Sequence, residues 1–206
     1  MSVTDPQEAV ARLIDDTDSE EAANAIRSFV IDQVTHKQAL EWMFEAVQVR
    51  PDIFPRMGYV AGSGSYYYLR IPDGTAYIKR IPSVLSVIEA AYGIENLTSS
   101  GTPYRHLYTV HPPPSPAGAH ITLGDSLPQK SIGHKVEFQL DCFSYYGDGK
   151  AGKKPSGFRS ELYPYRWYVL YVIGVSEDLR ELAPDYNDKP HISVGVGGMV
   201  HPVLGP

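Results

Sequence analysis

The sequence contains little cysteine, no long apolar run and no excess of basic charge, and each of these absences narrows the class of protein. The single cysteine, Cys142, excludes an internal disulfide framework and a multi-cysteine zinc site. No apolar run approaches the length that spans a bilayer, so we expect no membrane partner. The first residues lack the basic-then-apolar layout of a secretory signal. These features predict a cytoplasmic protein, in its own cell or in the cytoplasm of an infected host.

The formal charge of −6 is concentrated at one end of the 206-residue chain. Residues 1–50 hold ten acidic and four basic residues, so residues 51–206 are neutral on the same count. A neutral body lacks the basic surface that binding to a long nucleic-acid duplex requires. It is compatible with a small anionic ligand held at a local site. We therefore expect no long duplex among the partners.

The spacing of apolar residues predicts helices first and strands afterwards. Helical periodicity begins at Asp5, resumes at Ser19 and runs a third time from about Thr35 to Val49. Beyond it we expect strands over 66–71, 76–79, 104–110, 118–124, 134–146, 165–174 and 191–197, a helix over 82–92 ended by Gly93, and a short helix over 176–182. The predicted fold class is α+β with mostly antiparallel pairing. It divides into an acidic helical extension, residues 1–50, and one domain, residues 51–206.

Two five-residue segments share one pattern, HITLG at residues 120–124 and HISVG at residues 191–195. No other histidine of the chain has Ser or Thr two residues later. Alternate side chains of a strand point to the same face, so each segment presents an imidazole beside a hydroxyl above an apolar anchor. The glycine that ends each segment is expected to leave room for a ligand to approach. Two half-buried strands with structural histidines are the plainer alternative.

These residue types suit the cleavage of a phosphodiester. One imidazole can deprotonate the attacking oxygen and another can protonate the leaving oxygen near neutral pH. Two hydroxyls can donate hydrogen bonds to the non-bridging oxygens as negative charge builds. The sequence does not distinguish the base from the acid. A zinc site is less favoured, because no H-x-H, H-E-x-x-H or cysteine pair supplies the remaining ligands.

Paired H-x-[ST]-hydrophobic segments on well-separated strands resemble the motifs of the 2H phosphoesterase superfamily. Its members include LigT-like RNA 2′,3′-cyclic phosphodiesterases, RNA-repair phosphodiesterases and viral anti-CBASS enzymes that degrade cyclic-oligonucleotide immune signals. The resemblance covers roughly residues 57–200 in layout, and it implies a bilobal α+β fold with mostly antiparallel sheets flanking a central cleft. It also implies that His120 and His191 are the catalytic acid–base pair and that Thr122 and Ser193 bind phosphate oxygens, without metal or other cofactor.

Two further residues complete the predicted substrate-binding set. Tyr145 belongs to a group of aromatic residues that can stack on a nucleobase, and Lys153 lies in a Gly-rich loop, residues 147–164, where it can attract phosphate. The rest of the aromatic group consists of Tyr66, Tyr67, Tyr68, Tyr146, Tyr163, Tyr165 and Trp167. Core packing for the aromatic residues and a solvated loop for the lysine are the alternatives.

The sequence thus predicts a metal-independent phosphodiesterase, a hydrolase without cofactor. Its expected substrate is a small or cyclic (oligo)nucleotide, such as a cyclic oligonucleotide signal or the 2′,3′-cyclic phosphate of an RNA end. Two alternatives from other classes stay open. One is a nucleotide-binding module that sequesters its ligand without turnover. The other is an interaction protein that binds a protein partner through the acidic helices of residues 1–50.

Overall fold

The structure, a computed structural model, describes residues 5–29, 34–63, 66–97, 108–113, 115–124, 127, 129–146, 162–173 and 189–200. The helices of this part of the chain are α1 (Pro6–Asp15), α2 (Glu20–Phe29), α3 (His36–Gln48) and α4 (Thr75–Leu97), with a 3-10 turn, η2, at Gln129–Ser131. Its strands are β1 (Met57–Ser63), β2 (Tyr66–Arg70), β3 (Tyr108–His111), β4 (His120–Gly124), β5 (Lys135–Glu137), β6 (Gln139–Tyr146), β7 (Leu162–Ile173) and β8 (His191–Val200).

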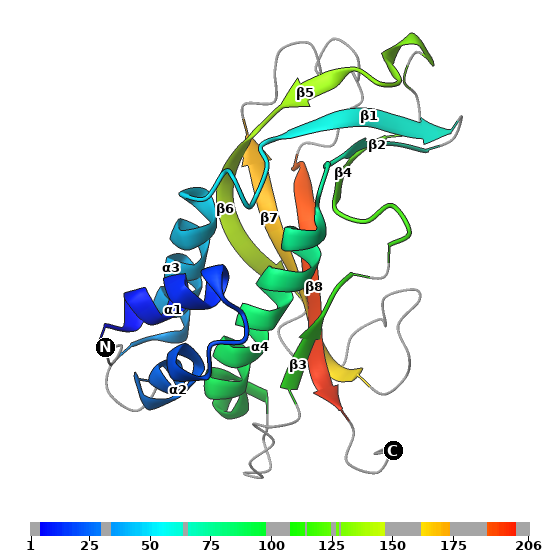
Figure 1. The fold of residues 1–206 in the computed structure, drawn as a ribbon. Coiled ribbons are helices and arrows are strands. Elements are labelled where there is room, and N and C mark those ends of the chain that lie inside the picture. The colour runs from blue at the N-terminus through cyan, green and yellow to red at the C-terminus, as the bar shows by residue number, and fades with distance from the viewer. Residues whose placement is uncertain are drawn as a thin grey trace.

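The eight described strands form one sheet in the order β5-β1-β2-β4-β8-β7-β6, and β3 pairs with the C-terminal half of β8. Every pairing is antiparallel. In Figure 1, β6, β7 and β8 run side by side, while β1, β2 and β5 lie across their upper end. The sheet therefore curls where β4 meets β8. The predicted α+β class with antiparallel pairing is confirmed.

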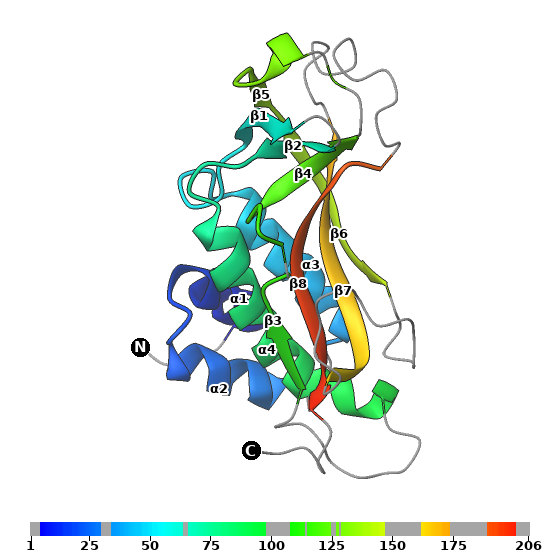
Figure 2. The ribbon, with the colours of Figure 1, turned by 90° about the vertical axis from the view of Figure 1, so that its right-hand side faces the viewer.

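The helices lie on one side of the long strands, as Figure 2 shows for β6, β7 and β8. Buried side chains of the sheet and of α4 form a single hydrophobic cluster that also includes Leu13 of α1, Ile26 of α2 and Met43 of α3. The core thus continues across residue 50, the predicted boundary between extension and domain. No described helix combines the length and the apolar character that a membrane span requires.

The three N-terminal helices agree with the periodicity of the sequence. Asp5 caps α1 by accepting a hydrogen bond from the Gln7 backbone N–H, and Thr35 caps α3 in the same way. The guanidinium of Arg50 binds the Asp15 carboxylate through two nitrogens and thereby holds the pKa of Asp15 below its ordinary value. The end of α1 is in this way fixed to the residues that follow α3. Binding of a protein partner by these helices stays a prediction.

The expectations for residues 75–97 are wrong in two places. We expect a strand over 76–79 and a helix that ends at Gly93, but α4 runs without interruption from Thr75 to Leu97. Five buried side chains of α4 recur at helical spacing: Tyr77, Ile81, Val84, Leu85 and Ile88. Burying each of them contributes roughly 1.5–3 kcal/mol, which together exceeds the cost of about 3 kcal/mol for Pro82 inside a helix.

The strand expected over 134–146 is divided into β5 and β6 at Phe138, whose side chain is buried and whose N–H donates to the carbonyl of Arg56. The strand expected over 104–110 is described only as β3. The short helix expected over 176–182 lies outside the described residues, as does most of the loop expected over 147–164.

Candidate functional site on one face of the sheet

The two matched segments meet where β4 and β8 pair. Ile121 of β4 lies opposite Ile192 of β8, and both side chains are fully buried in the core. Because side chains alternate along a strand, the residues on either side of each isoleucine point to the other face of the sheet. The antiparallel pairing therefore sets His120 beside Ser193 and Thr122 beside His191 on that face. We call it the histidine face; the described helices cover the opposite one.

Each imidazole of the pair is oriented by a backbone carbonyl two residues earlier. His120 Nδ1 lies 2.8 Å from the Gly118 oxygen, and His191 Nδ1 lies 3.0 Å from the Lys189 oxygen. A carbonyl can only accept a hydrogen bond, so Nδ1 carries the hydrogen in both rings. Nε2 is then the atom of each neutral ring that takes up a proton. Both side chains are half-buried, which leaves them accessible from the histidine face.

Tyr66 of β2 connects the two polar residues of the first segment. Its hydroxyl lies 3.0 Å from His120 Nε2 and 3.1 Å from Thr122 Oγ1. With the hydrogen of His120 on Nδ1, the phenol donates to Nε2 and Thr122 donates to the phenol oxygen. The edge of the Tyr68 ring also contacts His120, with ring centroids 5.5 Å apart. The sequence places both tyrosines in one strand but does not reveal that this strand pairs with β4.

Trp167 of β7 makes a corresponding hydrogen bond to the hydroxyl of the second segment. Its indole Nε1–H donates to Ser193 Oγ at 3.0 Å. Because the indole can only donate, the serine hydroxyl keeps its own hydrogen for an acceptor on a ligand. The ring of Tyr171 meets His191 edge-on, with centroids 6.0 Å apart. His191 Nε2, unlike that of His120, has no hydrogen-bond partner within the described part of the chain.

Arg70 adds a positive charge to the histidine face. It lies opposite His120 in the pairing of β2 with β4, and its side chain is exposed. Among the described residues Arg70 forms no ion pair. A guanidinium in this position suits an anion that binds beside His120. Only the strand pairing brings Arg70 to His120, so no local pattern in the sequence indicates that Arg70 belongs to this site.

The structure does not bring Tyr145 to the histidines, which corrects its assignment to the substrate-binding set. Its ring lies on the helical face, with the Arg166 guanidinium 4.5 Å above it and Tyr168 and His36 beside it. The neighbouring Tyr146 faces the other way and stacks on Trp167. Lys153, the other predicted substrate-binding residue outside the motifs, lies outside the described residues.

The two motif glycines have different roles. A side-chain carbon added at Gly124 would meet nothing within 4 Å, and the backbone there has a φ of +130°. One added at Gly195 would lie 2.6 Å from Val110 Cγ1 and 3.8 Å from Leu85 Cδ1, in the core between β3 and α4. The expectation that Gly195 gives a ligand room is therefore wrong. The close packing of β3 on β8 requires this glycine.

A buried ionic cluster lies behind β7, on the helical face. Arg166 Nη1 donates to Glu89 Oε2 at 2.5 Å, and His36 of α3 hydrogen-bonds the other oxygen of the same carboxylate. The side chain of Glu89 is fully buried and that of Arg166 nearly so. The cluster connects α3, α4 and β7, and its burial separates it from ligands on the histidine face. Buried charges persist only when they are paired in this manner.

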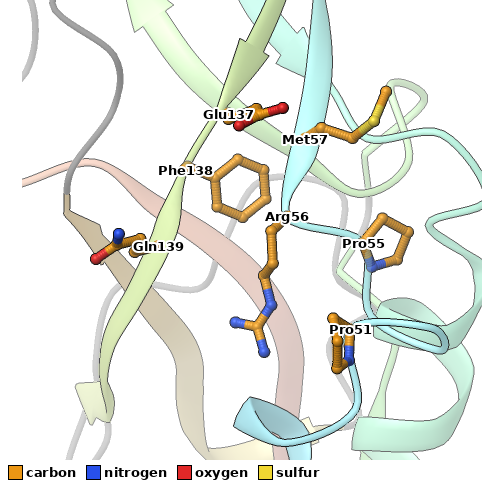
Figure 3. Close-up of a pocket in the computed structure, with 7 residues that line it drawn as sticks. All are labelled: Pro51, Pro55, Arg56, Met57, Glu137, Phe138 and Gln139. Carbon is orange, nitrogen blue, oxygen red and sulfur yellow. The ribbon is translucent and has the colours of Figure 1, made fainter.

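Two hollows of the described surface lie away from the motifs. One, of about 480 Å³, is lined by Pro51, Pro55, Arg56, Met57, Glu137, Phe138 and Gln139 (Figure 3). Its Arg56 donates to the carbonyls of Val47 and Gln48 at the end of α3, so the guanidinium is already occupied. The other is lined by acidic residues around the end of α1 together with Lys79 and Arg80. No described group of three His, Cys, Asp or Glu side chains converges as metal ligands would.

The chain matches no family model, no curated protein and no solved structure. The histidine face itself supplies two imidazoles oriented by equivalent carbonyl contacts, two hydroxyls bonded to aromatic side chains, and an arginine beside one imidazole. Such an arrangement can transfer protons at two points and donate hydrogen bonds to an anion bound on this face.

Proposed function

We propose that the protein is a phosphodiesterase of the 2H type that cleaves a small or cyclic (oligo)nucleotide. The observation that carries the proposal is the pairing of Ile121 with Ile192, which sets an imidazole and a hydroxyl from each segment on one face. The equivalent Nδ1 contacts of His120 and His191 support it, because each leaves Nε2 as the reactive nitrogen.

In the proposed reaction one imidazole takes the proton of the attacking oxygen, which then forms the new bond to phosphorus. The other imidazole gives a proton to the oxygen whose bond to phosphorus breaks. We assign the first role to His191, because its Nε2 has no hydrogen bond within the described residues, and the second to His120, which has to enter the reaction as the imidazolium with a proton on Nε2. Thr122 and Ser193 donate to the non-bridging oxygens as their charge grows. Arg70 attracts the phosphate to this end of the face.

The proposal also includes a division of the fold into two lobes. The described sheet has two halves, β5-β1-β2-β4 and β8-β7-β6. The motif strands β4 and β8 are the edge strands at which these halves join, through a single register pair. We propose that these halves are the two lobes of a 2H-like fold, with the substrate bound where they meet. The curl of the sheet at β4 and β8 supports this division (Figure 1).

Sequestration of a nucleotide without turnover is the second candidate function. The observation in its favour is the Tyr66 hydroxyl, which occupies His120 Nε2. A substrate must displace this hydroxyl before His120 can exchange a proton with it. A ligand that bound without displacing the Tyr66 hydroxyl would be held and not cleaved.

The test is a screen of cyclic dinucleotides, cyclic trinucleotides, 2′,3′-cyclic nucleotides and 2′-5′ oligomers, with product detection and with chelator present. The proposal expects a cleaved product from at least one of them, and no product from the His120→Ala, His191→Ala double variant. Tight binding without product in the wild type would favour sequestration. Turnover that persists in the double variant would reject the histidine mechanism.

A further inference from the structure

A pair of aromatic rings lies next to Ser193 on the histidine face. Tyr146 of β6 and Trp167 of β7 are opposite each other in the strand pairing, and their rings are nearly parallel, at 10°, with centroids 6.2 Å apart. Tyr146 is 49% exposed, the largest exposed fraction among the aromatic residues whose side chains the structure describes. Burial in the core therefore does not explain why an aromatic side chain stands at this position.

We propose that Tyr146 and Trp167 form a nucleobase subsite, on which the base of a bound nucleotide stacks. The proposal rests on the function proposed above, because it takes Ser193 as a phosphate-binding residue. The indole nitrogen of Trp167 lies 3.0 Å from Ser193 Oγ, so a nucleotide held there by its phosphate lies against the aromatic pair. Rings stack on any base, because every base has a π-face.

The aromatic residues at the other end of the histidine face are less suited to this task. The Tyr66 hydroxyl is bonded to His120 and Thr122, and the edge of the Tyr68 ring lies against His120. These contacts hold both rings against the catalytic imidazole. The base is assigned to the β6–β7 side because the Trp167 indole nitrogen reaches the phosphate-binding Ser193 there. The ligand class is a nucleoside phosphate, with little dependence on which base it carries.

The chain provides its own reporter, because its two tryptophans are Trp42 and Trp167. Trp42 belongs to α3 and packs against the core, on the helical side of the sheet. The Trp42→Phe variant leaves Trp167 as the sole indole, and we expect adenosine 5′-monophosphate to quench its emission in a saturable titration. Ribose 5-phosphate, which has the phosphate without the base, should leave the emission unchanged. In the matched Trp167→Phe variant neither ligand should change the emission of Trp42.

Substitution of Tyr146 then tests the subsite itself. In the Trp42→Phe background, Tyr146→Leu should weaken the affinity for adenosine 5′-monophosphate by roughly tenfold to a hundredfold. Its affinity for ribose 5-phosphate, measured by calorimetry, should not change. Tyr59→Leu is the control, because Tyr59 is also an exposed strand tyrosine but lies on β1. Equal quenching by the two ligands, or full affinity in Tyr146→Leu, would overturn the subsite.

These titrations require binding alone, so they separate the subsite from the proposed reaction. Base-dependent quenching in a protein that cleaves none of the screened substrates would support the subsite and reject the phosphodiesterase. Turnover of a dinucleotide by a protein whose Trp167 emission does not respond to the base would uphold the phosphodiesterase and reject the subsite.

Discussion

Ile121 of β4 and Ile192 of β8 form the one register pair that joins these two described strands. Both side chains are fully buried, and the half-buried polar residues beside them point to the other face of the sheet. The relative placement of the two motifs therefore depends on a hydrophobic contact that no ligand touches.

Substitution of one of these isoleucines should destabilise the protein. We expect Ile192→Ala to lower the free energy of unfolding by about 2–5 kcal/mol, because it leaves a cavity in the core. Denaturation in urea measures the change. Ile173 of β7 provides the control, since its side chain is 50% exposed and Ile173→Ala should have a much smaller effect. A similar loss of unfolding free energy in both variants would contradict a particular contribution of the Ile121–Ile192 contact to stability.

The four motif residues should differ in their effect on turnover. Loss of a general acid or base typically lowers the rate by about 10²–10⁴-fold, so we expect this from His120→Ala and from His191→Ala. Thr122→Ala and Ser193→Ala remove hydrogen bonds to a charged group, which contribute roughly 1.5–3 kcal/mol, or about tenfold to a hundredfold. Steady-state kinetics on the substrate found in the screen measures the loss of turnover in all four variants. An exposed histidine outside the motifs, His134, serves as the control.

Tyr66→Phe should raise turnover modestly, because the hydroxyl that orients His120 and Thr122 also occupies His120 Nε2, from which a substrate has to displace it. One hydrogen bond between neutral groups contributes about 0.5–1.5 kcal/mol, or roughly twofold to tenfold. Nitrogen NMR of the His120 ring should show a smaller fraction of the form with hydrogen on Nδ1. Tyr68→Phe removes a hydroxyl that has no hydrogen bond among the described residues, and it should change neither quantity. An unaltered His120 spectrum in Tyr66→Phe would contradict the orienting role.

Arg70→Gln should raise KM by about tenfold to a hundredfold, the range expected for a hydrogen bond to a charged phosphate. The wild-type KM should also rise with ionic strength, and this dependence should be weaker in the variant. Arg27 of α2 lies among the helices, and Arg27→Gln should leave the kinetics unchanged. Equal salt dependence in wild type and Arg70→Gln would remove Arg70 from the site.

The ion pair between Asp15 and Arg50 should make stability depend on pH. Arg50 lowers the pKa of Asp15 below its ordinary value of 3.8, so the pair stabilises the fold fully above that value. The contribution is lost as the pH falls through the lowered pKa. We expect Asp15→Asn to reduce Tm at neutral pH and to have little effect in strong acid. Glu137→Gln, which breaks an exposed pair with Lys135, should change Tm less at neutral pH.

The motif strands and the first three helices could be predicted from the sequence because their patterns are local. The repeat of HITLG as HISVG and the two-residue period are enough to place the polar side chains on one face. The start of α4 is not evident from the sequence, because residues 76–79 follow a predicted turn and contain Tyr77 and Ile78, residue types that favour strands, and four residues are too few to distinguish a strand from a helix.

Tyr145 and Tyr146 show what a local pattern leaves out. Counting alternate residues from the buried Leu140 places Tyr146 in the core and Tyr145 on the histidine face. The pairing of β6 with β7 shifts register between Leu140 and Phe143, and this irregularity exchanges the two faces for the rest of the strand. Arg70 is a similar case, since its approach to His120 depends on which strands become neighbours.

The contact between His36 and Glu89 has a practical consequence for anyone who trims the protein. A fragment that begins at residue 51 retains the Glu89 carboxylate and Arg166 but loses the imidazole that completes their buried cluster. The same fragment also loses the side chains that the three N-terminal helices bury in the core, such as Leu13, Ile26 and Met43, and the apolar surface they cover becomes exposed to water. Expression of the sheet and α4 by themselves should accordingly give an insoluble product, and a useful fragment has to retain all three N-terminal helices.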